Sequence, residues 1–162
     1  MTYTAAIITM SDACYAGKRE DGATPAVREL LVGSDFEVKE TALLPDEQTE
    51  ITEKLKEFAS KGYDLIVTTG GTGFSERDVT PEATLALGGR SVPGVAEAMR
   101  ANSMKYTSRA MLSRGVCVIA GKSVIVNLPG SPKACVENLS FVVEPLKHGI
   151  DALKGKVSEC AR

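Results

Sequence analysis

The segment from Tyr63 to Thr84 constrains the fold most, because it joins a short apolar run, a glycine-rich loop and a helix start. The apolar run, residues 65–67, is short enough for a buried strand, and Thr80-Pro81 is typical of a helix start. Between them lies the loop Thr69-Gly70-Gly71-Thr72-Gly73. The segment therefore predicts a strand, a glycine loop and a helix in that order.

The glycine loop has the composition of a phosphate site. Three glycines in four positions let backbone N–H groups turn toward an anion, and Thr69 and Thr72 add hydroxyl donors. Asp78 follows five residues after the last glycine, and a carboxylate beside a phosphate is best explained by a cation, here Mg²⁺, between them. An ordinary turn over a sheet edge remains an alternative at this point.

Two well-known phosphate motifs are excluded. A P-loop ends in Gly-Lys-Ser/Thr, whereas Phe74 follows the last glycine here. A dinucleotide fingerprint needs an acidic residue about 20 positions further on, at the end of a second strand. Asp78 is too near to the loop and precedes a helix, so it does not fit that pattern.

Composition narrows the class of protein. A chain of 162 residues with 43% hydrophobic and 5% aromatic residues predicts one mostly aliphatic core, and a net charge of −2 offers no basic field for nucleic acid. Basic residues between positions 90 and 114 indicate a solvated face, although some could meet an anionic ligand or a neighbouring subunit. No run approaches 18 apolar residues, so we expect no membrane span.

The cysteines and the start of the chain predict a reduced, cytoplasmic protein. Four cysteines lie far apart without a CxxC pair, and the chain has one histidine, so a zinc site is not expected. Cys14, near the expected site, is interpreted as an incidental thiol, with a reactive thiol as the alternative. Met1 leads directly into an apolar run, which predicts no signal peptide.

Periodicity predicts the remaining elements. Strands are expected at 4–10, 36–43, 115–120 and 123–128, and helices at 24–31, after 47 up to Gly62, 81–87, 94–105 and from Ser131-Pro132 onward. Gly121-Lys122 between the last two strands is a hairpin signal. We therefore expect an α/β, three-layer sandwich with a mostly parallel, mixed central sheet flanked by helices. One domain should cover residues 1–153, with a C-terminal tail at 154–162.

Four strand ends carry unusual polar or glycine-rich loops. They are Ser11-Asp12, Pro45-Asp46, Thr69 to Gly73 and Leu128-Pro129-Gly130. Ligands bind outside the carboxyl ends of strands in open α/β sheets, so the four loops predict one binding rim. Taken singly, Asp46 is also explained as a helix N-cap and Pro129-Gly130 as an ordinary turn.

These motifs, taken in order, resemble the molybdenum-cofactor biosynthesis proteins of the MogA/MoaB type, whose fold is also that of the gephyrin G domain. The resemblance rests on residues 11–12, Pro45-Asp46-Glu47, the glycine loop, 77–84 (RDVTPEAT) and 127–132 (NLPGSP), and it spans nearly the whole chain. It implies a molybdopterin adenylyltransferase, a nucleotidyltransferase that moves AMP from MgATP to the terminal phosphate of molybdopterin and releases pyrophosphate. It also implies a homotrimer, or a hexamer in some members, and a downstream molybdate-inserting protein as a partner.

The resemblance assigns roles to particular residues. Asp46 and Asp78 would be catalytic and hold Mg²⁺, while ATP and molybdopterin would be bound by Ser11, Asp12, Asp21, Thr69, Gly70, Gly71, Thr72, Gly73, Asn127, Pro129, Gly130 and Ser131. The sequence departs from the family pattern at 21–25, which weakens the assignment of Asp21.

The sequence leaves three questions open. It does not decide which carboxylate contacts the metal, or whether pterin or nucleotide phosphate occupies the glycine loop. A non-catalytic molybdopterin-binding or protein-anchoring module of the same fold is the alternative function.

Overall fold

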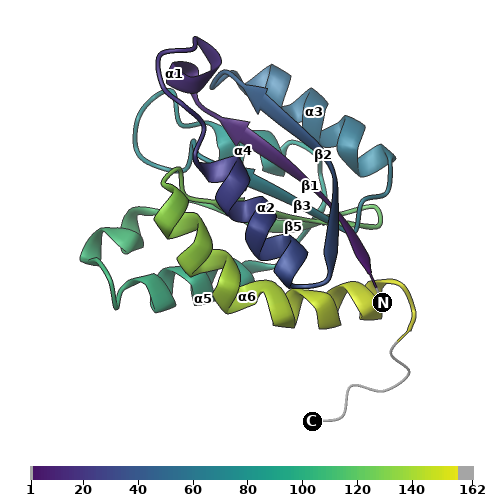
Figure 1. The fold of residues 1–162 in the computed structure, drawn as a ribbon. Coiled ribbons are helices and arrows are strands. Elements are labelled where there is room, and N and C mark those ends of the chain that lie inside the picture. Colours follow the sequence, from purple (N-terminus) through teal and green to yellow (C-terminus); the bar gives the residue numbers. More distant parts are fainter. Residues whose placement is uncertain (1, 157–162) are drawn as a thin grey trace.

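A six-stranded sheet forms the centre of the structure, a computed structural model that describes residues 2–156 (Figure 1). Its strands are β1 (Tyr3–Met10), β2 (Phe36–Leu44), β3 (Leu65–Thr69), β4 (Arg90–Ser91), β5 (Cys117–Ala120) and β6 (Ser123–Leu128). Their order is β2-β1-β3-β6-β5-β4. The first four in this order run parallel, and the β4-β5 and β5-β6 pairs are antiparallel. The prediction of a mixed, mostly parallel sheet is confirmed.

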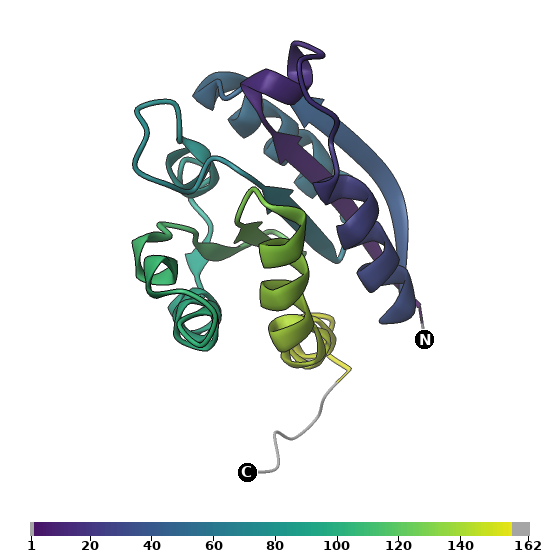
Figure 2. The same cartoon turned by 60° about the vertical axis from the view of Figure 1, so that its left-hand side comes forward.

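Helices cover both faces of the sheet and complete three layers (Figures 1 and 2). One face packs on α2 (Ala23–Gly33), α5 (Pro93–Ser103) and α6 (Pro132–Leu153), and the other on α3 (Gln48–Ser60) and α4 (Thr80–Leu85). The alternation of β1 explains the two cores, because Ala5 and Ile7 face the first set of helices and Ala6 and Ile8 the second. The predicted apolar stripe of α3 is confirmed, since Ile51, Leu55 and Phe58 are buried.

Three short elements were not predicted. They are α1 (Asp12–Tyr15), the two-residue strand β4 and the 3-10 helix η1 (Ser108–Leu112). None is long enough to show a periodic pattern. The expected C-terminal tail starts directly after α6, and residues 157–162 of it lie outside the described part of the chain.

Helix starts agree with the prediction at α6 and differ at α2. Ser131 caps α6, its hydroxyl accepting from the Ala134 N–H at 3.2 Å. Helix α2 begins at Ala23, one residue before the predicted start, and Asp21 Oδ1 accepts from the N–H groups of both Ala23 and Thr24 at 3.0 Å. The Asp21 carboxylate thus satisfies two N–H groups in the first turn of the helix.

The parallel register aligns the ends of four strands. Met10 of β1 lies opposite Leu44 of β2, and Thr69 of β3 lies opposite Thr9 on one side and Leu128 on the other. All four strands therefore end at one edge of the sheet, as the sequence predicted. The loops that follow them meet there.

Removing the Leu139 side chain should destabilise the protein by about 3 kcal/mol, because this α6 leucine is fully buried and Leu139→Ala leaves a cavity. Val136→Ala, one turn earlier and 36% exposed, is the matched control and should change the free energy of unfolding by less than about 0.5 kcal/mol. Urea denaturation of both variants measures the difference. Equal effects would contradict the placement of Leu139 in the core.

Candidate active site

A cavity of about 560 Å³ lies at the common edge of the parallel strands. Nine of the predicted site residues line it: Ser11, Asp21, Asp46, Thr69, Gly70, Gly71, Asp78, Gly130 and Ser131. Cys14 of α1 and residues from the α1–α2 connection, including Arg19, complete its wall. The structure thus brings together residues from all four predicted loops.

Asp12 and Asp46 are joined by two reciprocal hydrogen bonds, each from the backbone N–H of one residue to the carboxylate of the other. The Asp12 N–H donates to Asp46 Oδ2 at 2.9 Å, and the Asp46 N–H donates to Asp12 Oδ1 at 3.0 Å. The interpretation of Asp46 as the cap of α3 is wrong, since Glu47 is the N-cap residue and no side chain caps that helix. Its carboxylate is instead held in place at the edge of the cavity.

Asp12 itself lines neither this cavity nor the second one described below. Arg77 binds its carboxylate with two N–H groups, at 3.0 and 2.9 Å, and also pairs with Glu47 at 2.7 Å. These contacts with Arg77, with help from the Asp46 N–H, lower the pKa of Asp12. The carboxylate of Asp12 is therefore occupied within the protein, where it supports Asp46.

The ionised form of the Asp46 carboxyl group is unfavourable in the folded protein. Burial raises the pKa of its carboxyl group, and the negative charges of Asp12 and Asp78 raise it further, against the hydrogen bond from the Asp12 N–H. Asp46 and Asp78, the two predicted catalytic residues, line the same cavity. A cation between them would relieve this repulsion.

The donor set fits magnesium bound together with a substrate. Mg²⁺ is usually held by one or two carboxylates, with phosphate oxygens and waters as the other ligands. Over residues 2–156 no cluster of three or more His, Cys, Asp and Glu side chains is arranged to hold a metal ion. Asp46 and Asp78 alone would thus leave room for phosphate ligands.

The glycine loop needs glycine mainly because its backbone is packed tightly. Gly70 and Gly71 have φ angles of 88° and 66°, which disfavour residues with a Cβ atom. A Cβ atom at Gly71 would overlap the buried Thr80 hydroxyl and lie 3.2 Å from Asp46 Oδ1. At Gly73 it would lie 2.8 Å from Asp78 Oδ2. Both carboxylates therefore approach the loop closely.

The threonines of the loop differ from their expected role as phosphate donors. Thr69 is fully buried, and its hydroxyl donates to Thr9 Oγ1 at 3.0 Å, so this hydrogen bond holds β3 to β1. Thr72 is 7% exposed and lines another cavity, away from the carboxylates. The backbone of the loop remains as the better candidate for phosphate contact.

Two helix N-termini also point at the carboxylate-lined cavity. Residues 21–23 and 130–132, at the starts of α2 and α6, line its wall. The N-terminus of a helix carries a partial positive charge and favours anions. Asp21 and Ser131 accept hydrogen bonds from N–H groups in the first turns of these helices, so their roles are partly structural.

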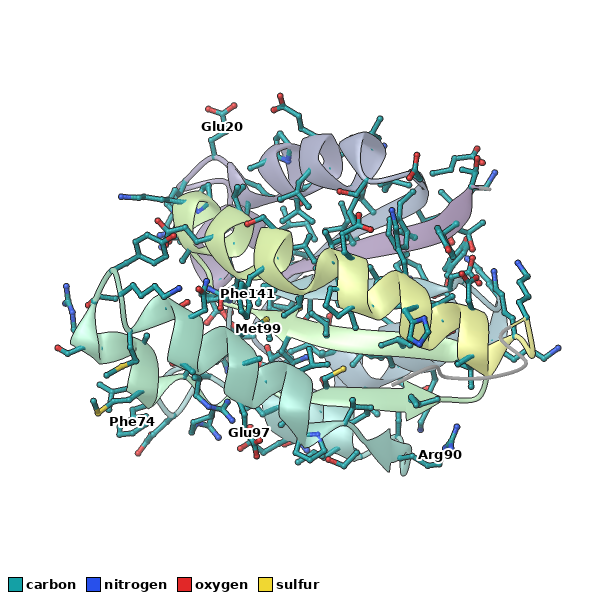
Figure 3. All side chains as sticks on the ribbon, turned by 90° about the horizontal axis from the view of Figure 1, so that it is seen from below. Glu20, Phe74, Arg90, Glu97, Met99 and Phe141 are labelled. Atoms are coloured by element: carbon teal, nitrogen blue, oxygen red, sulfur yellow. The ribbon has the colours of Figure 1, made fainter. Side chains whose placement is uncertain are left out.

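A second cavity of about 260 Å³ is lined by the end of the glycine loop. It holds the remaining predicted residues, Thr72, Gly73, Asn127 and Pro129, together with residues of α5, η1 and α6. Figure 3 shows one of these, Met99, between α5 and α6, while Phe74 and Glu97 point outward. Consecutive parts of the glycine loop thus line the two cavities, with Gly70 and Gly71 at the larger and Thr72 and Gly73 at the smaller.

Asn127 lines the smaller cavity with all of its amide atoms engaged. Its Nδ2 donates to Thr68 Oγ1 at 2.9 Å and to Thr84 Oγ1 at 3.0 Å, and its Oδ1 accepts from the Val116 N–H at 3.1 Å. The side chain joins β3, α4 and Val116, the residue before β5. Asn127 therefore supports the site through its neighbours.

The chain matches the family model of the probable molybdopterin binding domain over residues 6–148. It belongs to this family. The molybdopterin adenylyltransferase of Haemophilus influenzae is 43% identical over 153 residues, which cover 92% of this chain and 76% of that protein. The corresponding protein of Escherichia coli K12 is 42% identical over 154 residues, covering 90% and 78%.

Solved structures agree with this membership. The molybdopterin biosynthesis enzyme MoaB from Thermus thermophilus has a TM-score of 0.90 and 44% identity, covering 98% of this chain and 100% of that one. The resemblance stated from the motifs is confirmed. In the described residues of this molybdopterin-binding domain, no helix is both long and apolar enough to cross a membrane.

Sequence motifs assigned no role to the basic residues that support the site from outside, although Arg77 lies in the 77–84 motif. Arg77 anchors Asp12, Arg100 Nη1 donates to the carbonyl oxygens of Ser113 and Gly115, and Arg114 binds the glycine loop. The basic residues between 90 and 114 were the only signal for the last two. Their interpretation as a solvated face is wrong for Arg100 and Arg114, which bind backbone carbonyl groups.

The substitution Asp46→Asn should stabilise the metal-free protein at neutral pH. An acid whose pKa is raised by folding destabilises the folded state while it is ionised, and this cost disappears below the unfolded pKa of about 3.9. Asparagine can still accept the hydrogen bond from the Asp12 N–H. Thermal unfolding with EDTA present should therefore show a higher midpoint for the variant at pH 7, with a gain that shrinks toward pH 4.

Glu97→Gln, on the exposed face of α5, is the control and should leave the unfolding midpoint unchanged (Figure 3). A midpoint for Asp46→Asn at or below that of the wild-type protein at pH 7 would contradict the account of Asp46 as a destabilising charge.

Proposed function

We propose that this chain is a molybdopterin adenylyltransferase, which transfers AMP from MgATP to the terminal phosphate of molybdopterin and releases pyrophosphate. Relatives of that name at 42–43% identity support the assignment. The observation that carries it is the pair of cavities lined by consecutive parts of the glycine loop. A transfer between two phosphorylated substrates needs two adjacent sites of this kind.

The carboxylate-lined cavity suits the triphosphate of ATP. Asp46 and Asp78 would hold Mg²⁺ there, and the metal would neutralise charge on the phosphates. The starts of α2 and α6 add positive potential. Since the Gly70 N–H donates to Leu128 O, residues 71–73 supply the backbone N–H groups that would contact phosphate.

The smaller cavity suits a flat heteroaromatic ring. Ala96, Met99 and Leu112 supply apolar walls, while the hydroxyl of Ser103 and the amide of Asn138, 3.1 Å apart, supply polar atoms. Ligand pockets of this kind bind a ring by apolar contact and select it by a few polar groups. We assign the pterin to this cavity, so that its phosphate reaches the part of the glycine loop next to the ATP site.

The chemistry requires positioning more than proton transfer. An oxygen of the molybdopterin phosphate forms a bond to the α-phosphorus of ATP, and the bond between that phosphorus and the bridging oxygen to the β-phosphate breaks, so that pyrophosphate leaves. The attacking phosphate is already anionic at neutral pH. A site without a histidine or a reactive thiol is therefore sufficient, provided that the phosphates are held in line and their charge is offset.

The substitution Asp78→Asn should lower turnover at least about 100-fold, because one charged ligand of the phosphate-bound metal is lost. The amide retains an oxygen that can accept from the Ser75 N–H, so the fold should persist. Mass spectrometry of adenylylated pterin and a pyrophosphate assay measure the effect. Glu76→Gln, an exposed carboxylate on the same loop, is the control and should retain activity within a few-fold.

Each result of this experiment has a distinct meaning. Full activity of Asp78→Asn would remove Asp78 from the mechanism. Wild-type protein that binds molybdopterin but forms no adenylylated product would favour the non-catalytic binding module.

We further propose that the protein is a homotrimer. Met104, Tyr106, Met111 and Leu112 are 40–59% exposed and leave an apolar surface around α5 and η1. Sedimentation equilibrium should give three times the chain mass of 17.1 kDa, or six times in a hexamer. A mass of 17.1 kDa at micromolar concentration would contradict the proposal.

The free thiols Cys14, Cys117 and Cys135 support a cytoplasmic location. The expected recipient of the product is a protein that inserts molybdate.

A further inference from the structure

Arg114, between η1 and β5, contacts both the glycine loop and Asp78, and so spans the exposed segment that follows the loop. Its backbone N–H donates to Thr72 O at 2.9 Å, its Nε to Gly73 O at 2.8 Å and its Nη2 to Asp78 O at 2.6 Å. The guanidinium also forms an ion pair with Glu82 in the first turn of α4. One residue therefore holds both ends of the segment 73–78.

Apart from Arg114, the segment 73–78 is fixed to the rest of the protein mainly by Arg77, which binds Asp12 and Glu47. Residues 74–77 are exposed, and none of them belongs to either hydrophobic core. Figure 3 shows Phe74 projecting from the body of the protein. Asp78 Oδ2 accepts from the Ser75 N–H at 3.0 Å, but that bond lies within the segment and does not fix it to the sheet. Arg77 connects the outer side of the segment to Asp12 and Glu47.

The planar guanidinium suits this position better than an ammonium group. Its N–H groups have fixed directions, so binding two carbonyl oxygens and a carboxylate fixes their relative positions. Two of the bonded carbonyl groups belong to residues that line different cavities, Gly73 and Asp78. The neighbours of Arg114 in sequence, Ser113 and Gly115, also line the smaller cavity.

We propose that Arg114 is a positioning residue that sets Asp78 at the correct place opposite Asp46. This inference rests on the proposed function, because it assigns the two carboxylates to one metal-nucleotide site. Arg114 does not touch the reacting atoms. It acts by holding the Asp78 carbonyl group and the glycine loop against the segment that leads into β5.

Three variants test the inference on the full chain. Arg114→Met keeps much of the side-chain volume and removes every guanidinium donor. Arg114→Lys keeps the charge but provides one ammonium group in place of the fork. Glu82→Gln removes only the ion pair and leaves the bonds to Gly73 and Asp78 intact, so it is the matched control.

Two readouts do not depend on turnover. The first is binding of Mn²⁺ with a non-hydrolysable ATP analogue, measured by electron paramagnetic resonance. The affinity should fall about 10-fold to 100-fold in Arg114→Met and less in Arg114→Lys, as for other residues that orient metal ligands. The second is amide hydrogen exchange, which should become faster at residues 73–79 in both arginine variants. Glu82→Gln should stay within about 3-fold of the wild-type protein in affinity.

The outcomes separate this inference from the proposed function. If the wild-type protein binds Mn²⁺ with the analogue and Arg114→Met binds it equally well, the inference is wrong and the proposed function is unaffected. If Glu82→Gln loses as much affinity as Arg114→Met, the ion pair rather than the carbonyl contacts is responsible, which also overturns it. If the wild-type protein binds no Mn²⁺ with the analogue, the metal-dependent function fails and the inference fails with it.

Discussion

The parallel register of β2, β1, β3 and β6 is the constraint on which the rest of the structure depends. Thr9, Thr69 and Leu128 pair across three neighbouring strands, so three chain segments far apart in sequence end at the same level. Because β3 and β6 are buried on both faces, a shift of one residue would exchange their two sets of core side chains. The packing that fixes the core therefore also fixes the relative height of the loops that carry Asp46, the glycines and Ser131.

The site at this edge of the sheet includes an ionised carboxylate, that of Asp46, which destabilises the folded protein. Burial and neighbouring negative charge raise the pKa of Asp46, and Asp78 contributes to that charge. Arg77 pairs with the Asp12 carboxylate, whereas neither Asp46 nor Asp78 forms an ion pair among the described residues, and both of these aspartates line the cavity. This division explains why Asp12 supports the site from outside it.

Sequence reasoning succeeded where a role depends on residues close together in the chain. The strand before the glycine loop, the Ser131 cap and the hairpin at Gly121 are local patterns, and each is confirmed. The reasoning failed for contacts such as those of Arg77 with Asp12 and of Arg114 with Gly73, which join residues 65 and 41 positions apart. Nothing local distinguishes these arginines from solvated ones. The smaller cavity was missed for the same reason, because η1 shows no periodicity and its position depends on tertiary packing.

The same limit explains why the glycine loop was only partly understood from sequence. From the sequence, the glycines were explained by the access that they give phosphate to backbone N–H groups. The structure adds a second requirement, because Asp46 closely approaches Gly71 and Asp78 closely approaches Gly73. Both requirements act on the same few atoms. A side chain at Gly73, which lines the smaller cavity, would displace the Asp78 carboxylate. The carboxylates can come this close only because the loop is bare backbone, and the proposed phosphate contacts with its N–H groups need the same absence of side chains.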